Sequence, residues 1–182
     1  LVHTRLSIID LTGGHQPIHD ASDRYTLVAN GEIYNYRELR EDQLSAGCLF
    51  QTESDSETIL HAIHLHGLEG LQQLFGMFAF ALMDQQTQVL TLARDRLGIK
   101  PLYYASLPDR FIFASELKSL LLLLPGQAQV TAEGLAQFLQ NQFSSGQETL
   151  IHNIHRVLPG ECLQVTSGLE VRRHTYWDPR LI

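Results

Sequence analysis

The sequence has few cysteines, no long hydrophobic run and no excess of positive charge. Its 182 residues include 2 cysteines, Cys48 and Cys162. These are too few and too far apart to form a disulfide framework, so we expect both to be buried and reduced. The most apolar run, residues 117–125, is far shorter than the roughly 20 residues of a membrane-spanning helix. The net charge of −7, from 20 acidic and 13 basic residues, offers no basic surface to nucleic acid or to an anionic membrane. Disulfide-rich secreted proteins, proteins anchored by a spanning helix within this sequence and nucleic-acid-binding proteins are therefore disfavoured.

The first residues, LVHTRLSIID, also lack an initiator methionine and a secretory leader. We therefore expect residue 1 to be a cut inside a longer protein. The expected compartment is the cytoplasm.

What the sequence does contain is the composition of a globular domain, with 44% hydrophobic and 18% charged residues. Hydrophobic periodicity predicts strands at residues 5–9, 25–29, 76–83, 88–94, 102–105, 110–114, 161–166 and 169–176. It predicts helices at residues 35–46, 55–66, 68–74, 116–123 and 132–142. Short polar turns between several strands favour antiparallel hairpins, and hence an α+β fold. The segment GMFAFALMD is apolar on both faces, which is typical of a strand covered on each side in a layered sandwich.

The stretch NGEIYNYREL, residues 30–39, raises the first functional question. An Asn-Gly pair after alternating apolar residues is a strong hairpin signal. However, Asn35 and Glu38 have the spacing of a helix cap, which leaves too few residues for a returning strand. We therefore predict that the chain makes an exposed bend at Asn30 and Gly31 and then enters a helix. Such a bend can present backbone N–H groups and a side-chain amide to a ligand.

The stretch SDSE, residues 54–57, has two interpretations. Ser54 and Glu57 have the spacing of a capping box at the start of a helix, and an acidic side chain there suits the helix dipole. This assignment leaves Asp55 without a role. A free carboxylate at this position could bind an ammonium group.

Arg5 lies beside a predicted apolar strand. It could pair with Asp10, but its planar guanidinium group can equally donate two parallel hydrogen bonds to a substrate carboxylate. Taken together, Arg5, Asn30 with Gly31, and Asp55 would supply a carboxylate clamp, two donors for a developing oxyanion and an ammonium partner. An enzyme that attacks the side-chain amide of a free amino acid needs these groups.

The histidines do not predict a metal site. His61 and His64 share a face of a predicted helix, whereas His66 points away, and no cysteine or carboxylate stands beside them at the spacing of a zinc motif. We therefore expect no metal in this chain.

Several motifs nevertheless resemble a known family. RLSIIDLTGGHQP, ANGEIYNYREL, SDSETIL, FGMFAFALMD, RDRLGIKPLYY, FASELKSLL and ETLIHNIHRVLPGE occur in the order found in class II glutamine amidotransferases. RDRLGIKPLYY resembles most the glutaminase domain of glutamine-dependent asparagine synthetases. The resemblance implies a four-layer αββα sandwich of antiparallel sheets, the fold of N-terminal-nucleophile hydrolases, truncated at its N-terminus. Residues 1–178 would be the glutaminase domain, and residues 179–182 the start of a linker to a synthetase domain.

The resemblance also implies roles for individual residues. The side-chain amide of Asn30 and the backbone N–H of Gly31 would form the oxyanion hole. Arg5 would bind the α-carboxylate of L-glutamine, and Asp55 with Glu32 would bind its α-ammonium. Further contacts with glutamine would come from Leu6, Ser7, Ile8 and Ile9.

The sequence departs from the family at the nucleophile. The family uses an N-terminal cysteine whose own α-amino group serves as base, whereas this chain starts at Leu1. We expect the chain alone to bind glutamine weakly and not to hydrolyse it. The parent protein would pass ammonia to a synthetase domain that uses ATP and Mg to convert aspartate to asparagine, and it could be a homodimer. The alternatives are a related enzyme that amidates another carboxylate, and a non-catalytic module with the same fold.

Overall fold

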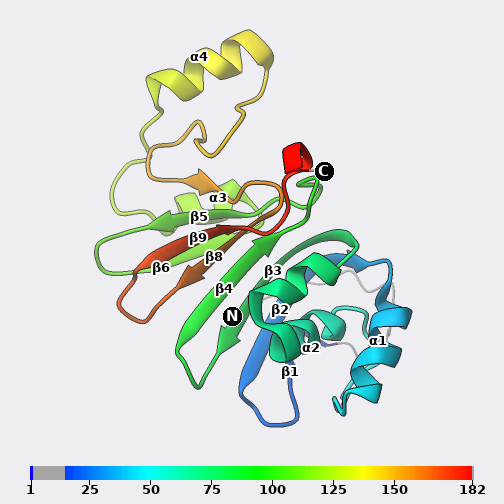
Figure 1. Cartoon of the computed structure of the whole chain (residues 1–182). Coiled ribbons are helices and arrows are strands. Elements are labelled where there is room, and N and C mark those ends of the chain that lie inside the picture. The colour runs from blue at the N-terminus through cyan, green and yellow to red at the C-terminus, as the bar shows by residue number, and fades with distance from the viewer. Residues whose placement is uncertain (2–14, 182) are drawn as a thin grey trace. The chain divides into compact units, whose positions relative to one another are not determined.

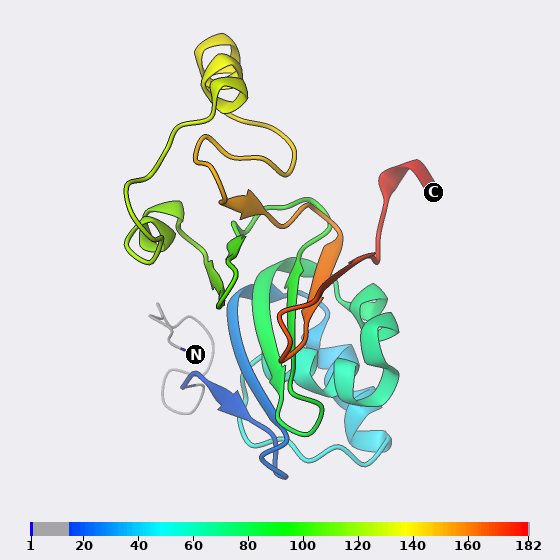
Figure 2. The ribbon, with the colours of Figure 1, turned by 90° about the vertical axis from the view of Figure 1, so that its left-hand side faces the viewer.

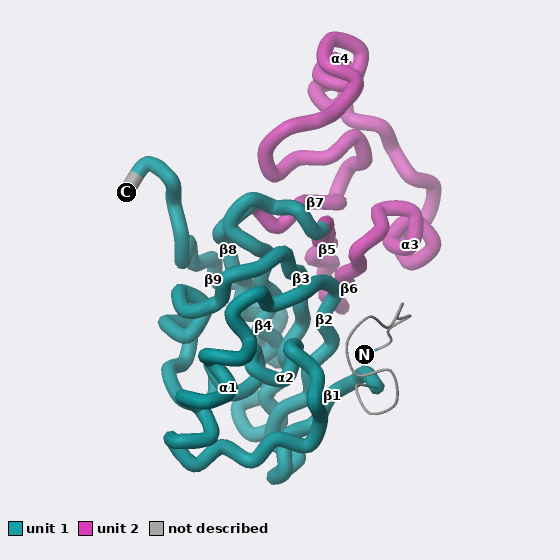
Figure 3. Tube along the Cα trace, turned by 90° about the vertical axis from the view of Figure 1, so that its right-hand side faces the viewer, with its two compact units in different colours: residues 1–100, 159–182 teal, residues 101–158 magenta. Residues whose placement is uncertain are grey.

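Antiparallel strands, several of them joined in pairs by short turns, alternate with short helices along the chain (Figures 1 and 2). The computed structural model describes residue 1 and residues 15–181 of the chain. Two compact units are distinguished in Figure 3, the first formed by residues 1–100 and 159–182 and the second by residues 101–158. The α+β class and the antiparallel sheets predicted from the sequence are confirmed. No helix among residues 15–181 is long and apolar enough to cross a membrane.

The first unit is built on a six-stranded sheet of order β1-β2-β3-β4-β8-β9, antiparallel throughout. Its strands are β1 (Ile18–His19), β2 (Tyr25–Ile33), β3 (Gly76–Asp84), β4 (Val89–Arg94), β8 (Glu161–Val165) and β9 (Val171–Thr175). Its helices are α1 (Tyr36–Ser45), α2 (Glu57–His66) and the 3-10 helices η1 (Gly67–Gln73) and η2 (Pro179–Leu181). Residues 68–74 were predicted as an α-helix, but the structure has the tighter 3-10 form there.

The core of the first unit lies between the sheet and the helices α1, α2 and η1. Phe78, Phe80 and Leu82 of β3 point into this core together with apolar residues of both α-helices. Ala79 and Ala81 point to the opposite face of the same strand, yet they are only 3% and 1% exposed. Strand β3 is therefore buried on both faces, which confirms the prediction made from GMFAFALMD.

Strand β2 is longer than predicted. It continues through Asn30 and Gly31 to Ile33, and it pairs with β3 over its whole length. The predicted exposed bend at Asn30 and Gly31 is therefore wrong. A nine-residue neighbour, β3, provides pairing partners as far as Gly76, and this tertiary pairing overrides the local turn signal of Asn-Gly.

The second unit contains a three-stranded sheet of order β6-β5-β7. Its strands are β5 (Tyr103–Ser106), β6 (Phe111–Ala114) and β7 (His155–Arg156), and its helices are α3 (Leu117–Leu121) and α4 (Ala132–Asn141). The two-residue strands β1 and β7 were not predicted, because two residues are too short to show a period.

An ion pair joins the residue before β2 to the end of β3 in the first unit. Arg24 donates to both carboxylate oxygens of Asp84, at 3.1 and 2.8 Å, and Asp84 also accepts from the N–H of Gln86 at 2.9 Å. The Arg24 guanidinium is the main reason why the pKa of the Asp84 carboxyl falls to about 2. The folded state thus favours the ionised carboxylate.

We expect Asp84→Asn to lower the free energy of unfolding by about 1–2 kcal/mol at neutral pH. Because the pKa is lowered on folding, the stabilisation is fully present above the ordinary aspartate pKa and is lost as the pH falls toward 2. Urea unfolding at neutral and acidic pH should therefore show that the difference in free energy of unfolding between the unsubstituted protein and Asp84→Asn disappears in acid. A pH-independent difference would contradict this assignment.

Candidate active site

Gly31 lies inside β2 where the backbone of β3 comes unusually close. Its φ is +141°, and a Cβ atom added to it would lie 1.9 Å from the carbonyl oxygen of Met77. Side chains are rarely tolerated at such a φ, and no side chain fits at such a distance. Glycine is therefore required here by close strand pairing, and not by a turn.

The hydrogen-bond alternation of the ladder directs the Gly31 N–H away from β3. The N–H of Tyr34 donates to the carbonyl of Phe75 at 2.7 Å, which identifies this opposed pair as hydrogen-bonded. Hydrogen-bonded and non-hydrogen-bonded pairs alternate along antiparallel strands. Three positions earlier, Gly31 opposite Phe78 is a non-hydrogen-bonded pair, so the Gly31 N–H points to the outer edge of β2.

Side chains occupy this outer edge on both sides of Gly31. Gln16 accepts from the N–H of Ala29 at 2.7 Å and donates to its carbonyl at 2.8 Å. Two residues beyond Gly31, the N–H of Ile33 donates to Oδ2 of Asp55 at 2.8 Å. Within residues 15–181, nothing accepts from the Gly31 N–H that lies between them. As far as residues 15–181 are concerned, this edge thus presents one N–H without an acceptor between two backbone positions that are hydrogen-bonded to side chains.

Asp55 is a buried carboxylate without a cationic partner in the described part of the chain. It stands two residues before α2 and is 4% exposed. Burial, and secondarily the charge of Glu32, raises its pKa, while the hydrogen bond from Ile33 acts in the opposite direction. An ionised carboxylate in such surroundings is costly unless a cation approaches it. The position is therefore prepared for a positively charged group.

Asn30 and Glu32 are half-buried, and along β2 they alternate with residues that face the core between the sheet and the helices. Ala29 and Ile33 belong to that core, so alternation along β2 places the side chains of Asn30 and Glu32 on the opposite face of the sheet. The side-chain amide of Asn30 and the open N–H of Gly31 therefore belong to consecutive residues of one strand. The bond between Ile33 and Asp55 ties this strand to the start of α2.

Asn35 is the residue before α1, as predicted, but its side chain makes no capping bond. It instead donates to the carbonyl of Gln73 and accepts from the N–H of Phe75, at 2.9 and 3.0 Å. The predicted cap with Glu38 is therefore wrong. A side chain that can bridge both groups of a distant segment satisfies more partners there than at its own helix start.

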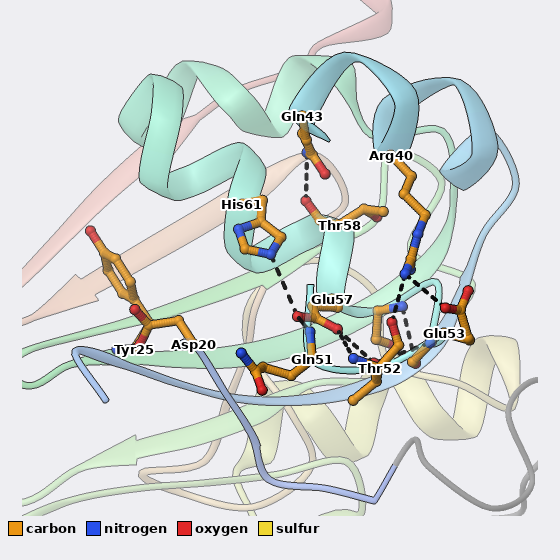
Figure 4. A network of polar contacts seen from close by, with 12 residues as sticks. Asp20, Tyr25, Arg40, Gln43, Gln51, Thr52, Glu53, Glu57, Thr58 and His61 are labelled. Carbon is orange, nitrogen blue, oxygen red and sulfur yellow. Dashed lines mark hydrogen bonds and ion pairs between the residues drawn. The ribbon is translucent and has the colours of Figure 1, made fainter. Parts of the chain in front are cut away.

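The capping box predicted at Ser54 and Glu57 is also wrong. Glu57 accepts from the backbone N–H groups of Gln51 and Thr52, both at 2.7 Å, and from the hydroxyl of Thr52 (Figure 4). The Nε2 atom of His61 lies 3.5 Å from the same carboxylate. Glu57 thus holds the loop before Asp55, and it does not reach back to Ser54.

The structure gives no position for the other residues that were predicted to bind glutamine. Arg5, Leu6, Ser7, Ile8 and Ile9 lie outside the described residues. Among residues 15–181, no three histidine, cysteine or acidic side chains are grouped to hold a metal ion. Cys48 and Cys162 are free and buried, as predicted, and burial raises the pKa of both thiols, that of Cys162 to about 12.

Sequence reasoning missed Gln16 and the loop contacts of Glu57. Gln16 stands in the motif RLSIIDLTGGHQP, which carries the family resemblance. A glutamine before a proline gives no local sign that it bonds a strand 13 residues away.

Comparison with known proteins identifies the family of this chain. A family model described as a glutamine amidotransferase domain matches residues 1–177. Asparagine synthetase [glutamine-hydrolyzing] 1 of Bacillus subtilis is 39% identical over 173 residues, which are 95% of this chain and 27% of that protein. Amidase chyE of Penicillium rubens is 37% identical over 180 residues, or 98% of this chain and 26% of that protein. The chain thus spans about a quarter of the length of these relatives.

Solved structures show the same fold. The glutamine phosphoribosylpyrophosphate amidotransferase of B. subtilis superposes with a TM-score of 0.59 at 21% sequence identity, covering 89% of this chain and 32% of that one. At this identity the likeness concerns the fold alone. The match of the family model over nearly the whole chain, together with the relatives above, shows that this chain belongs to the glutamine amidotransferase domain family.

Proposed function

We propose that this chain is the glutaminase part of a glutamine-hydrolysing asparagine synthetase. It would bind L-glutamine and help to release ammonia from its side-chain amide. The observation that carries the proposal is the pairing of two features on one edge of β2. An open N–H at Gly31 lies next to a buried Asp55 carboxylate, which has no cationic partner among the described residues. These features suit an amide oxygen that gains negative charge and an ammonium group on the same small molecule.

The proposed chemistry requires a cysteine nucleophile in addition to the residues named above. A cysteine thiolate would attack the amide carbon, and the carbonyl oxygen would take up the electron pair. The Asn30 amide and the Gly31 N–H would donate hydrogen bonds to that oxyanion. Asp55 and Glu32 would hold the α-ammonium, and Arg5 the α-carboxylate, with Leu6, Ser7, Ile8 and Ile9 lining the pocket. The oxyanion would then collapse to a thioester as the C–N bond breaks, and the leaving nitrogen would depart as ammonia with the proton that the cysteine's α-amino group had taken from the thiol. Water would then hydrolyse the thioester to glutamate and restore the thiol.

The parent protein would use this ammonia to amidate aspartate, with ATP and Mg bound in a synthetase domain. Names of relatives support this acceptor, since several are called asparagine synthetases. Amidase chyE is not called an asparagine synthetase, and a related enzyme that amidates another carboxylate is the alternative. A third candidate is a non-catalytic module. The coding sequence upstream of Leu1 separates an enzyme from such a module: Met-Cys-Gly at its start supports an enzyme, whereas another residue after Met supports the module.

The raised pKa of Asp55 gives a pH prediction for the intact protein. The carboxylate binds an ammonium only when ionised, and burial makes it accept a proton above the ordinary aspartate value. We expect the KM for glutamine to be constant near neutral pH and to rise as the pH falls through this raised pKa. Initial rates of glutamate release across the acidic range measure it. In Asp55→Asn, the KM for glutamine should no longer rise as the pH falls. If it still rises, the titrating group is a residue other than Asp55.

A further inference from the structure

Glu57 is fully buried at the first turn of α2, and it uses both carboxylate oxygens on the preceding loop. Oε1 accepts from the N–H of Gln51, and Oε2 accepts from the N–H and the hydroxyl of Thr52, each at 2.7 Å (Figure 4). Burial alone would raise the pKa of Glu57, but the nearby His61 side chain and the hydrogen bonds from Thr52 and Gln51 lower it. An ionised carboxylate is thus held at the centre of the network.

A chain of hydrogen bonds leads from Glu57 to the residues on either side of Asp55. The Thr52 hydroxyl, which donates to Glu57, accepts from the N–H of Ser54 at 3.1 Å. The Ser54 hydroxyl in turn accepts from the N–H of Ser56 at 3.3 Å. Asp55 lies between these two serines, so its backbone is fixed from both sides by bonds that originate at Glu57.

Helix α1 holds the same loop from another direction. Arg40 donates to the carbonyl of Thr52 at 2.9 Å (Figure 4). Its guanidinium also lies over the Phe50 ring, 4.1 Å from the ring centroid. The His61 ring packs against Phe50 with centroids 4.3 Å apart. The loop is therefore tied to both helices before it reaches Asp55.

We propose that Glu57 is a positioning residue that aims the Asp55 carboxylate at the α-ammonium of L-glutamine. This inference rests on the proposed function, because it requires Asp55 to be the ammonium partner. Such positioning requires a carboxylate, because a glutamine at position 57 would turn an NH2 group toward one of the two backbone N–H groups and leave it unpaired. The loop would then shift, and Asp55 with it.

The test compares Glu57→Gln, Asp55→Asn and the double variant in the intact protein. We expect Glu57→Gln to raise the KM for L-glutamine at least about tenfold. The inhibition constant of 5-amino-5-oxopentanoate, which has the amide and carboxylate of glutamine but no ammonium, should stay within about twofold. In the Asp55→Asn background, Glu57→Gln should have no further effect on the KM, because the two residues act through one contact.

A milder pair of variants covers the case in which Glu57→Gln does not fold. Thr52→Val removes the hydroxyl that links Glu57 to Ser54, whereas Thr52→Ser keeps it, so only Thr52→Val should raise the KM for glutamine. Equal losses for glutamine and the analogue, or additive effects with Asp55→Asn, would overturn the inference. If Asp55→Asn raises the KM but neither Glu57→Gln nor Thr52→Val does, the inference alone fails. If Asp55→Asn leaves the KM unchanged, the proposed role of Asp55 fails and the inference fails with it.

Discussion

Replacing Asn30 by alanine in the intact protein is expected to lower glutamine turnover by two to three orders of magnitude. The loss of one oxyanion donor typically costs about 3 kcal/mol of transition-state stabilisation. The backbone of Asn30 pairs with Ala79 inside the sheet, so alanine leaves β2 in place. The effect should fall on kcat more than on KM, because the oxyanion exists only along the reaction path. Steady-state rates of glutamate release measure both constants.

Asn35→Ala is the matched control for this substitution. Its side chain bridges Gln73 and Phe75, and its loss should lower the free energy of unfolding by about 1 kcal/mol. We expect its turnover to stay close to that of the unsubstituted protein. If Asn30→Ala reduced turnover by less than tenfold, or if Asn35→Ala reduced it equally, Asn30 would not be an oxyanion donor.

Asp55→Asn is expected to raise the KM for glutamine about a hundredfold without destabilising the fold. Removing one partner of a buried charge pair costs about 3 kcal/mol of binding. Asparagine can still accept from the Ile33 N–H through its amide oxygen. Initial-rate kinetics and urea unfolding of the same protein preparation measure the two effects.

The stability of Asp55→Asn follows from the sign of the pKa shift. A pKa raised by burial means that the ionised carboxylate opposes folding above the ordinary aspartate pKa, and that this cost shrinks as the pH falls through the raised value. At neutral pH the neutral asparagine avoids the cost, so the free energy of unfolding should be equal or higher. A parallel loss of affinity and stability would instead make Asp55 a structural helix-start residue.

The general architecture was predictable because strand and helix periods are local. The two-sided burial of β3 could be predicted from GMFAFALMD, since apolar residues at every position leave no solvent-facing side. The continuation of β2 through Gly31 was not, because it depends on pairing with β3 more than 40 positions away. Asn-Gly carries the same local signal whether or not a long neighbouring strand is present.

The candidate site shows the same division between local and distant information. Asp55 was predicted to be free because the expected capping box used only Ser54 and Glu57; the structure contradicts that box, yet it does place the Asp55 carboxylate, buried, on the N–H of Ile33. Gln16 and Glu57 could not, since their partners, Ala29 and the loop at Gln51 and Thr52, are fixed by tertiary structure. The predicted caps failed for this reason: Asn35 and Glu57 have the right spacing but find better-matched partners elsewhere.

The amide resonance of Gly31 tests the central claim most directly. In protein labelled with 15N-glycine, saturating L-glutamine should shift the Gly31 resonance, because its open N–H acquires the amide oxygen of the ligand as acceptor. Gly168, in the turn between β8 and β9 at the opposite edge of the same sheet, should stay unchanged. Glutamine that binds at saturation while the Gly31 resonance does not move would contradict the assignment of this strand edge as the amide-binding site.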